Sequence, residues 1–277
     1  MKPHKLVLLC GVLLLLVGGS ACSKYLNALK ARDHLNQGVG AFRNAQFQQA
    51  IEHFKAAVNL DPNLLNARLY LATAYAQQYI PGGESPDNIK IGNQAVAGFD
   101  DVLKQDPNNL TAIASIAQIY YNMKNFDKAK EYQRRRMQVD PQASEPYYWI
   151  GVINWAIAYP KAQQVRRDLN LTMPKDPAKP DVLPPIPVKE RGKLEAENKA
   201  LVEEGIEALQ KATQLKPNDS DAMVYLNLLY RQKAEYDADD AMRKADLDQA
   251  NEWVDKATEV RKAGSAKAAP APAPASE

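Results

Sequence analysis

A recurring proline constrains the fold of this chain more than any other sequence feature. Asp61-Pro62-Asn63, Asp106-Pro107-Asn108, Asp140-Pro141 and Lys216-Pro217-Asn218 each follow a stretch with apolar residues at helical spacing. Proline cannot continue a helix, because it lacks a backbone donor and its ring clashes with the preceding turn. Each site therefore predicts a helix end followed by a turn. Regular recurrence of such a unit is typical of arrays in which one helical hairpin stacks on the next.

Small and aromatic residues hold fixed places before the first of these prolines. Within residues 31–64 they are Gly38, Ala50, Phe54, Ala57 and Pro62, at positions 8, 20, 24, 27 and 32. This spacing resembles the tetratricopeptide repeat, a helix–turn–helix unit of about 34 residues. In that family the small residues at positions 8 and 20 let helices A and B pack closely. The resemblance implies an all-α fold, and no strand-like alternation competes with it.

The same register continues along the chain and predicts a right-handed αα-superhelix of about five helix pairs. One pair cannot bury its apolar face alone, so neighbouring pairs stack. Three pairs are longer than the family unit, which predicts inserts between their helices. The predicted repeats cover residues 31–64, 65–109, 110–143, 144–219 and 220–262, within a solenoid over residues 22–262.

The longest predicted insert covers residues 160–200. Its first part, Pro160–Pro187, is rich in proline and is expected to form an extended loop, whereas Lys189–Leu215 has helical spacing. The loop is interpreted either as a brace across the solenoid or as a ligand for a partner domain. It also has the length to cover a groove that a plain array leaves open.

The start of the chain has the three parts of a secretory signal, predicted over residues 1–21. Lys2 and Lys5 precede the apolar run Leu6–Val17, and small residues follow it. This run is shorter than the ~20 residues that a membrane-spanning helix needs. Gly19-Ser20-Ala21-Cys22 resembles the lipobox of bacterial lipoproteins, although Gly19 stands where Leu is usual. The resemblance implies that Cys22 is acylated and anchors an outer-membrane lipoprotein facing the periplasm; the alternative is a soluble periplasmic chain.

The net charge of the chain speaks against a nucleic-acid-binding function. Lys2 and Lys5 account for the whole formal excess of +2, so no basic surface favours nucleic acid.

The Ala/Pro-rich residues 263–277 are predicted to be a disordered tail, because alternating proline removes backbone donors.

The sequence contains no constellation typical of an enzyme or a metal site. HExxH, CxxC and phosphate-binding glycine motifs are missing, which predicts no catalytic residue, no metal and no cofactor. His34 is expected to be a partly buried structural residue. Asp237, Asp239 and Asp240 are interpreted as a solvated helix start rather than a calcium site, because the spaced loop that calcium needs is missing.

The resemblance also implies a concave groove lined by helix A of each repeat. Leu35 and Val39 stand where chaperone-binding members carry the Lys and Asn of a carboxylate clamp, so that clamp is absent. Aromatic residues are instead expected in the groove, either gripping an extended peptide or packing against the protein's own inserts. The candidate partner-binding residues are Phe42, Tyr121, Tyr148, Trp155, Arg32 and Arg231.

Together these features predict a non-enzymatic scaffold of the bacterial cell envelope that binds and assembles partner proteins. The alternative is a periplasmic carrier of a small ligand or peptide, or an accessory subunit of an enzyme. A ligand-sized cavity enclosed by the Pro160–Pro187 loop would favour that alternative.

Overall fold

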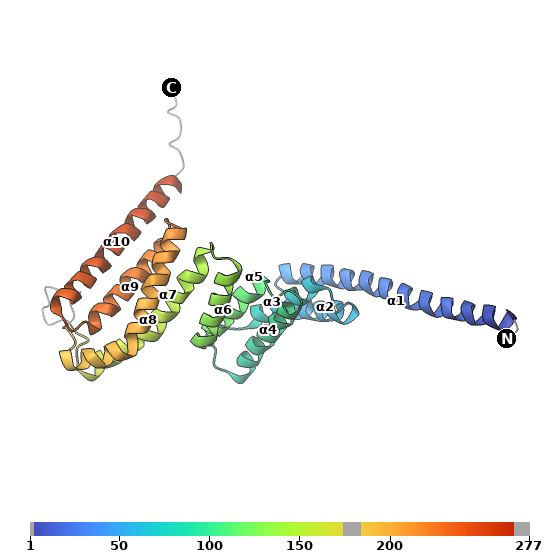
Figure 1. Ribbon diagram of the computed structural model, residues 1–277, viewed down its shortest axis with the longest axis horizontal. Coiled ribbons are helices and arrows are strands. Elements are labelled where there is room, and N and C mark those ends of the chain that lie inside the picture. Colours follow the sequence, from blue (N-terminus) through green and yellow to red (C-terminus); the bar gives the residue numbers. More distant parts are fainter. Residues whose placement is uncertain (1–2, 174–183, 269–277) are drawn as a thin grey trace, which may run out of the picture. The chain divides into compact units, whose positions relative to one another are not determined.

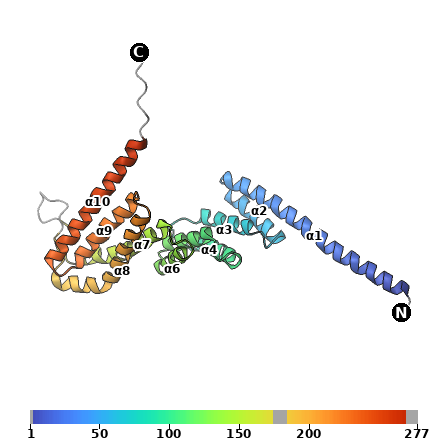
Figure 2. The ribbon, with the colours of Figure 1, turned by 45° about the horizontal axis from the view of Figure 1, so that its top comes forward.

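The described part of the chain is all-helical and consists of helices paired in chain order. The computed structural model describes residues 3–173 and 184–268, with side chains for residues 23–173 and 184–265. Ten α-helices occupy these residues, and within each unit the helices that are consecutive in the chain pack against each other (Figures 1 and 2). The predicted all-α fold of about five helix pairs is confirmed. The chain divides into two compact units, Met1–Asn125 and Phe126–Glu277, which are described separately.

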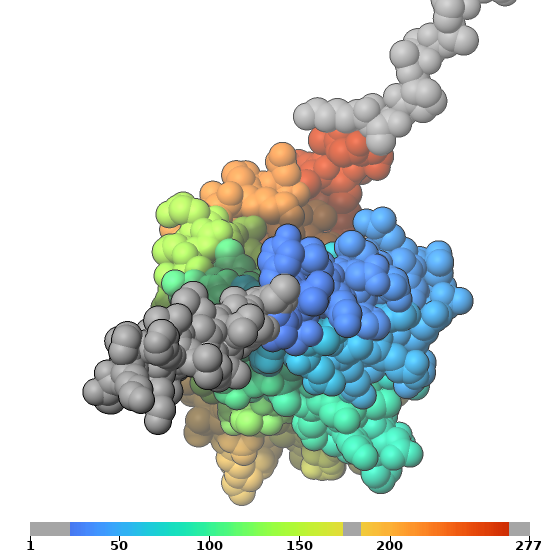
Figure 3. Space-filling model, turned by 90° about the vertical axis from the view of Figure 1, so that its right-hand side faces the viewer, coloured from blue at the N-terminus to red at the C-terminus, as the bar shows by residue number. Residues whose placement is uncertain are grey.

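Unit 1 is built around close contacts between small residues and aromatic rings. A Cβ atom added to Gly38 would lie 2.5 Å from Cε1 of Phe54, so only glycine lets α1 approach α2 this closely. The ring of Phe54 stacks on Tyr70 of α3, with centroids 5.4 Å apart. Figure 3 looks onto this unit, where α1 and α2 lie side by side. Its helices are α1 (Pro3–Arg43), α2 (Phe47–Leu60), α3 (Leu65–Gln78), α4 (Pro86–Gln105) and α5 (Leu110–Asn122).

Polar residues beside the prolines end one helix and begin the next. The helix α2 ends directly before Asp61-Pro62, where the Asp61 amide donates to Ala57 O at 2.9 Å. After the second proline, Asn109 Oδ1 accepts the amide of Ala112 at 3.0 Å and caps α5. Such a cap satisfies a backbone donor that the first helical turn leaves without a partner.

The insert of the second repeat is a short loop held by one buried side chain. Asn88 Nδ2 donates to the carbonyls of Ile80 and Gly83, both at 2.8 Å, and its Oδ1 accepts the Ile80 amide at 2.7 Å. Ser85 caps the following helix α4 by accepting the Asn88 amide at 3.2 Å. These bonds satisfy backbone groups that the loop takes out of helical pairing.

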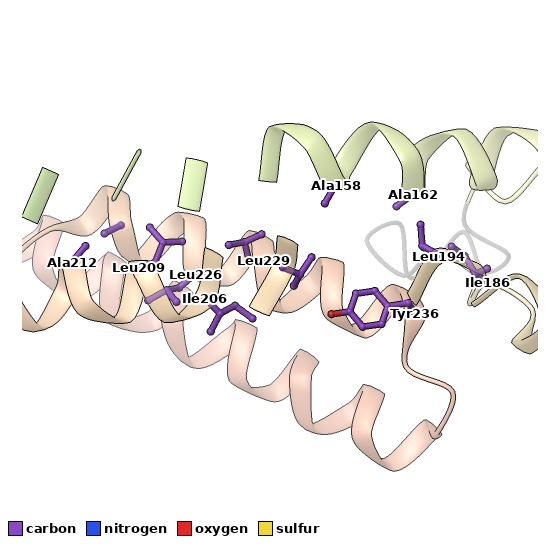
Figure 4. Close-up of a cluster of buried hydrophobic side chains, with 12 residues drawn as sticks. Ala158, Ala162, Ile186, Leu194, Ile206, Leu209, Ala212, Leu226, Leu229 and Tyr236 are labelled. Atoms are coloured by element: carbon purple, nitrogen blue, oxygen red, sulfur yellow. The ribbon is translucent and has the colours of Figure 1, made fainter. Parts of the chain in front are cut away.

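Unit 2 has a longer core shared by α7, α8 and α9 (Figure 4). Leu209, Leu226 and Leu229 are fully buried in it. A Cβ added to Gly151 would lie 2.3 Å from Cγ of Leu209, so glycine again sets the spacing of helix A and helix B. The helices of this unit are α6 (Phe126–Val139), α7 (Ser144–Asp168), α8 (Val188–Leu215), α9 (Ser220–Tyr236) and α10 (Asp240–Ala268).

The expectation that a loop begins at Pro160 is wrong. The helix α7 continues through Pro160 to Asp168. Pro160 lies on the exposed side of the helix, while Ala162 and Arg166 in the following turns are buried. Packing of those turns outweighs the one backbone hydrogen bond that proline removes. Residues 174–183 of the predicted loop lie outside the described residues.

The last helix is longer than predicted, and parts of both chain ends lie outside the described residues. The final helix α10 runs to Ala268, six residues past the predicted solenoid boundary at 262. Alanine and lysine there favour helix, and the first proline comes only at Pro270. The remaining tail lies outside the described residues, as do the side chains of the predicted signal and of Cys22. Across the residues that are described, no helix has the length and apolar character to cross a membrane.

Candidate functional site

Four aromatic rings from two A-type helices of unit 2 form a continuous surface. Tyr148, Trp155 and Tyr159 come from α7 and Tyr225 from α9, and together they are called the aromatic cluster. Tyr225 contacts Tyr148 and Trp155 edge to face, each at a centroid distance of 5.7 Å. Trp155 stacks on Tyr159 at 4.9 Å. Both geometries are favourable arrangements for aromatic pairs.

The aromatic cluster lies between the hydrophobic core and the solvent. Tyr148, Trp155 and Tyr225 are half-buried and pack on the core of unit 2. Tyr159 is 39% exposed and forms the outer end of the cluster. The indole Nε1 of Trp155 is buried and has no hydrogen-bond partner in the structure. The cluster therefore offers apolar ring surface to the solvent from a firmly packed base.

The opposite side of α7 is fixed by a partly buried ionic network. Lys130 Nζ donates to Asn154 Oδ1 at 2.8 Å and also pairs with Glu204. Asn154 Nδ2 donates to Glu204 Oε2 at 2.9 Å, and Arg134 binds the other carboxylate oxygen. Burial alone would raise the pKa of Glu204, but the hydrogen bonds from Lys130, Asn154 and Arg134 hold this pKa below its ordinary value. The network joins α6, α7 and α8 and holds the helix that carries most of the cluster.

A second ionic contact pins the end of α7 to the insert and to α9. Arg166 donates to both carboxylate oxygens of Glu235, at 2.7 and 2.6 Å. The same guanidinium donates to the carbonyls of Leu171 at 3.2 Å and Pro184 at 2.9 Å. Just beyond, Ile186 is buried at 1% exposure. Residues 184–187 thus lie against the core, and Arg166 satisfies carbonyls that no helix can pair.

The structure brings only two of the predicted partner-binding residues, Tyr148 and Trp155, into the aromatic cluster. Arg231, also in unit 2, donates to Asn227 Oδ1 at 2.8 Å and to Asn251 Oδ1 at 2.9 Å. Sequence reasoning missed Tyr159 and Tyr225. Tyr159 directly precedes the proline at which a loop was expected, and Tyr225 does not occupy a groove position of the family pattern.

The other predicted residues belong to unit 1 and form no comparable surface with one another. Phe42 contacts Phe47 at 5.4 Å and Tyr70 at 6.4 Å, both edge to face, and packs on the local core. Arg32 is exposed on α1. Tyr121 is half-buried on α5, and burial raises the pKa of its hydroxyl. Among the ring neighbours of Phe42 and Phe54 in unit 1, Tyr70 is 36% exposed, while Phe54 is fully buried.

The interpretation of Asp237 as a solvated residue is wrong. Its side chain is only 7% exposed, because Arg191 Nη1 donates to the Asp237 carbonyl at 2.9 Å and holds this turn inward. Burial, together with the neighbouring buried carboxyl group of Asp246, raises the pKa of Asp237 to about 7. Asp239 and Asp240 are exposed, as expected for a helix start. Among the described side chains, no three His, Cys, Asp or Glu residues group as metal ligands would.

His34, which was expected to be a structural residue, contacts His53. His34 of α1 and His53 of α2 are half-buried, with their Nδ1 atoms 3.4 Å apart. This contact joins the two helices of the first pair. A cavity of about 170 Å³ also lies in unit 1, lined by residues that include Tyr79, Gly83 and Met123.

Comparisons with known proteins agree with this architecture. The family model described as "Tetratricopeptide repeat" matches residues 110–142, which coincides with the third predicted repeat. DnaJ protein P58IPK homolog B of Oryza sativa subsp. japonica is 26% identical over 130 residues, which is 46% of this chain and 25% of that protein. Hsp70-Hsp90 organizing protein 3 of Arabidopsis thaliana is 23% identical over 122 residues, covering 44% of this chain and 20% of that protein. The matches thus span a quarter or less of these relatives.

Solved structures extend the similarity over most of the chain. A crystal structure of MamA superimposes with a TM-score of 0.56 at 16% identity, covering 88% of this chain and 98% of that one. MamA from Desulfovibrio magneticus RS-1 gives a TM-score of 0.54 at 19% identity, covering 84% and 96%. At these identities the likeness establishes the fold alone.

Proposed function

Because the chain is a tetratricopeptide-repeat protein with an all-α fold of paired helices, we propose that it is a non-enzymatic, protein-binding scaffold. The observation that carries this proposal is the aromatic cluster. It presents ring surface on the A-type helices, and ionic networks fix the helix beneath it. Aromatic side chains with a rigid base supply much of the binding energy at protein interfaces, because little rotamer freedom is lost on binding.

The proposal extends to where this scaffold works. The signal-like start and the lipobox-like Gly19–Cys22 support an exported chain that is anchored by acylated Cys22 in the bacterial outer membrane and faces the periplasm. There it would recruit or assemble protein partners of the cell envelope. Acyl chains together with a folded solenoid would hold those partners near the membrane surface.

The location is tested by separating membranes from soluble protein in cells that express the native chain or Cys22→Ala. We expect the native protein in the membrane fraction with the mass of an acylated chain. Retention of Cys22→Ala in membranes at the native level would contradict the lipid anchor.

Partner binding is tested by comparing two exposed apolar residues of unit 2. Tyr159 belongs to the aromatic cluster, whereas Met242 is 56% exposed on the B-type helix α10. Proteins that co-purify with the native chain from membranes should be reduced about tenfold or more with Tyr159→Ala, because a lost anchor residue costs at least ~1.4 kcal/mol. Met242→Ala should retain them, and equal retention by both variants would contradict this use of the cluster.

A further inference from the structure

Large apolar side chains stand exposed on α1 among the first residues whose side chains are described, apart from the aromatic cluster. Tyr25 is 67% exposed, Leu26 51% and Leu29 45%. Residues three and four apart lie on one side of a helix, so these side chains form one stripe. Ala31, two residues after Leu29, is fully buried against the rest of unit 1. Two residues correspond to about 200° around a helix, so the stripe lies on the side facing away from α2.

The described side chains of unit 1 leave this stripe exposed. The pairing of α1 with α2 is made farther along the helix, at Gly38 against Phe54 and at His34 against His53. Figures 1 and 2 show the start of α1 running beyond α2. An exposed apolar stripe on an ordered helix marks a surface that another phase or molecule covers.

Charge and sequence position favour a lipid surface as the occupant. Lys24, Lys30 and Arg32 are exposed around the stripe, and such side chains reach anionic headgroups while their stems cover apolar surface. Tyrosine is favoured where one end of a side chain is apolar and the other is wet. In the sequence, Cys22 precedes Tyr25 by three residues and Leu26 by four, which is one helical turn.

We propose that the α1 stripe of Tyr25, Leu26 and Leu29 lies in the interface of an anionic phospholipid bilayer, next to an acyl group on Cys22. The inference deepens the proposed function and rests on its membrane location. Since α1 continues without a break into the first repeat, this contact would hold the solenoid at the membrane surface rather than on a flexible tether.

The test places a fluorescent label on each side of the helix. Full-length chains with Cys10→Ser carry an environment-sensitive dye at Leu29→Cys or, as the matched control, at the exposed Asn27→Cys two residues away. Both are reconstituted into vesicles of phosphatidylethanolamine and phosphatidylglycerol that contain a quencher in the lipid. We expect quenching at position 29 to exceed that at position 27 by about threefold or more, because only the stripe enters the interface.

The remaining outcomes are separable. Equal quenching at the two positions would overturn the proposal. Protection at position 29 that rises with protein concentration and is insensitive to the lipid quencher would assign the stripe to a second copy of the chain, and so also overturn it.

Labelling of Cys22 in the Cys10→Ser chain would reveal a free thiol and contradict the acyl anchor. The contrast between positions 29 and 27, repeated with Cys22→Ser, would still decide whether the stripe meets the bilayer.

Discussion

Among the described residues, unit 1 buries a single polar side chain, Asn88, whereas unit 2 buries ten polar or charged ones. Asn88 serves the short connection between α3 and α4. In unit 2, Arg166 and Arg191 serve the much longer connection between α7 and α8 by donating to the carbonyls of Pro184 and Ile186. Part of the difference therefore comes from the longer insert, which brings irregular backbone against the core, where the charged donors Arg166 and Arg191 satisfy its carbonyls.

Loss of Arg166 should produce the largest difference in stability between the two units. Arg166→Ala leaves Glu235 and two carbonyls without their donor, so we expect the free energy of unfolding of unit 2 to fall by about 3–5 kcal/mol. Its exposed neighbour Arg167, which donates to the exposed Gln164, is the control, and Arg167→Ala should cost less than about 0.5 kcal/mol. Urea denaturation, with amide hydrogen exchange as the readout, measures the loss of unfolding free energy in each unit. Similar losses for the two variants would contradict the assigned role of Arg166.

Glycine packing should be a property that the two units share. In unit 1, Gly38→Ala forces a methyl group into the ring of Phe54 and should cost about 1–3 kcal/mol of stability. At Gly40 on the same helix a Cβ would meet nothing within 4 Å, so Gly40→Ala should stabilise by about 0.5–1 kcal/mol. Thermal unfolding of the two variants should move in opposite directions.

The same contrast applies in unit 2. Gly151→Ala should destabilise because its Cβ would meet Leu209, and Gly192→Ala should stabilise because its Cβ meets nothing within 4 Å. If Gly151→Ala were tolerated while Gly38→Ala was not, close packing of helix A on helix B would distinguish the units rather than unite them.

The stability of unit 2 should also depend on pH, and this effect should be smaller than that of losing Arg166. The pKa of Asp237 is raised from 3.8 to about 7, so the folded state holds a proton that the unfolded state releases. This contribution to stability is present below about pH 4 and is lost as the pH rises through about 7. Between pH 5 and 8 we expect native unit 2 to lose at least about 1 kcal/mol relative to Asp237→Asn.

Glu204 does not obscure this comparison. Its pKa lies below the ordinary value of 4.5, so its own contribution to stability is lost only as the pH falls further into the acid range. Urea denaturation at several pH values gives the difference between the native chain and Asp237→Asn. A difference that does not change with pH would contradict the raised pKa of Asp237.

Local sequence rules predicted the features of this molecule that depend on local interactions. The helix ends at Asp61-Pro62 and Asp106-Pro107 follow from the missing donor of proline, and Gly38 opposite Phe54 follows from the repeat register. The same proline rule failed at Pro160, because tertiary packing of the next turns outweighed it. Sequence reasoning applies a local penalty but does not show what the following turn will bury.

The candidate site was only half predictable for a related reason. Tyr148 and Trp155 occupy groove positions of the repeat pattern, whereas Tyr225 joins them only because α7 and α9 lie side by side. Asp237 was misplaced because Arg191, 46 residues earlier, holds its turn inward. Contacts between distant segments leave no periodic signal in a single sequence.

Photo-crosslinking in intact cells tests the central claim most directly. A photoreactive phenylalanine analogue replaces Tyr159 in the aromatic cluster or Met242 on α10, two exposed positions of the same unit. We predict a discrete adduct with an envelope protein from position 159 that is at least about tenfold weaker from position 242. Adducts of equal strength from both positions, or none from position 159, would contradict a scaffold that binds its partners through the aromatic cluster.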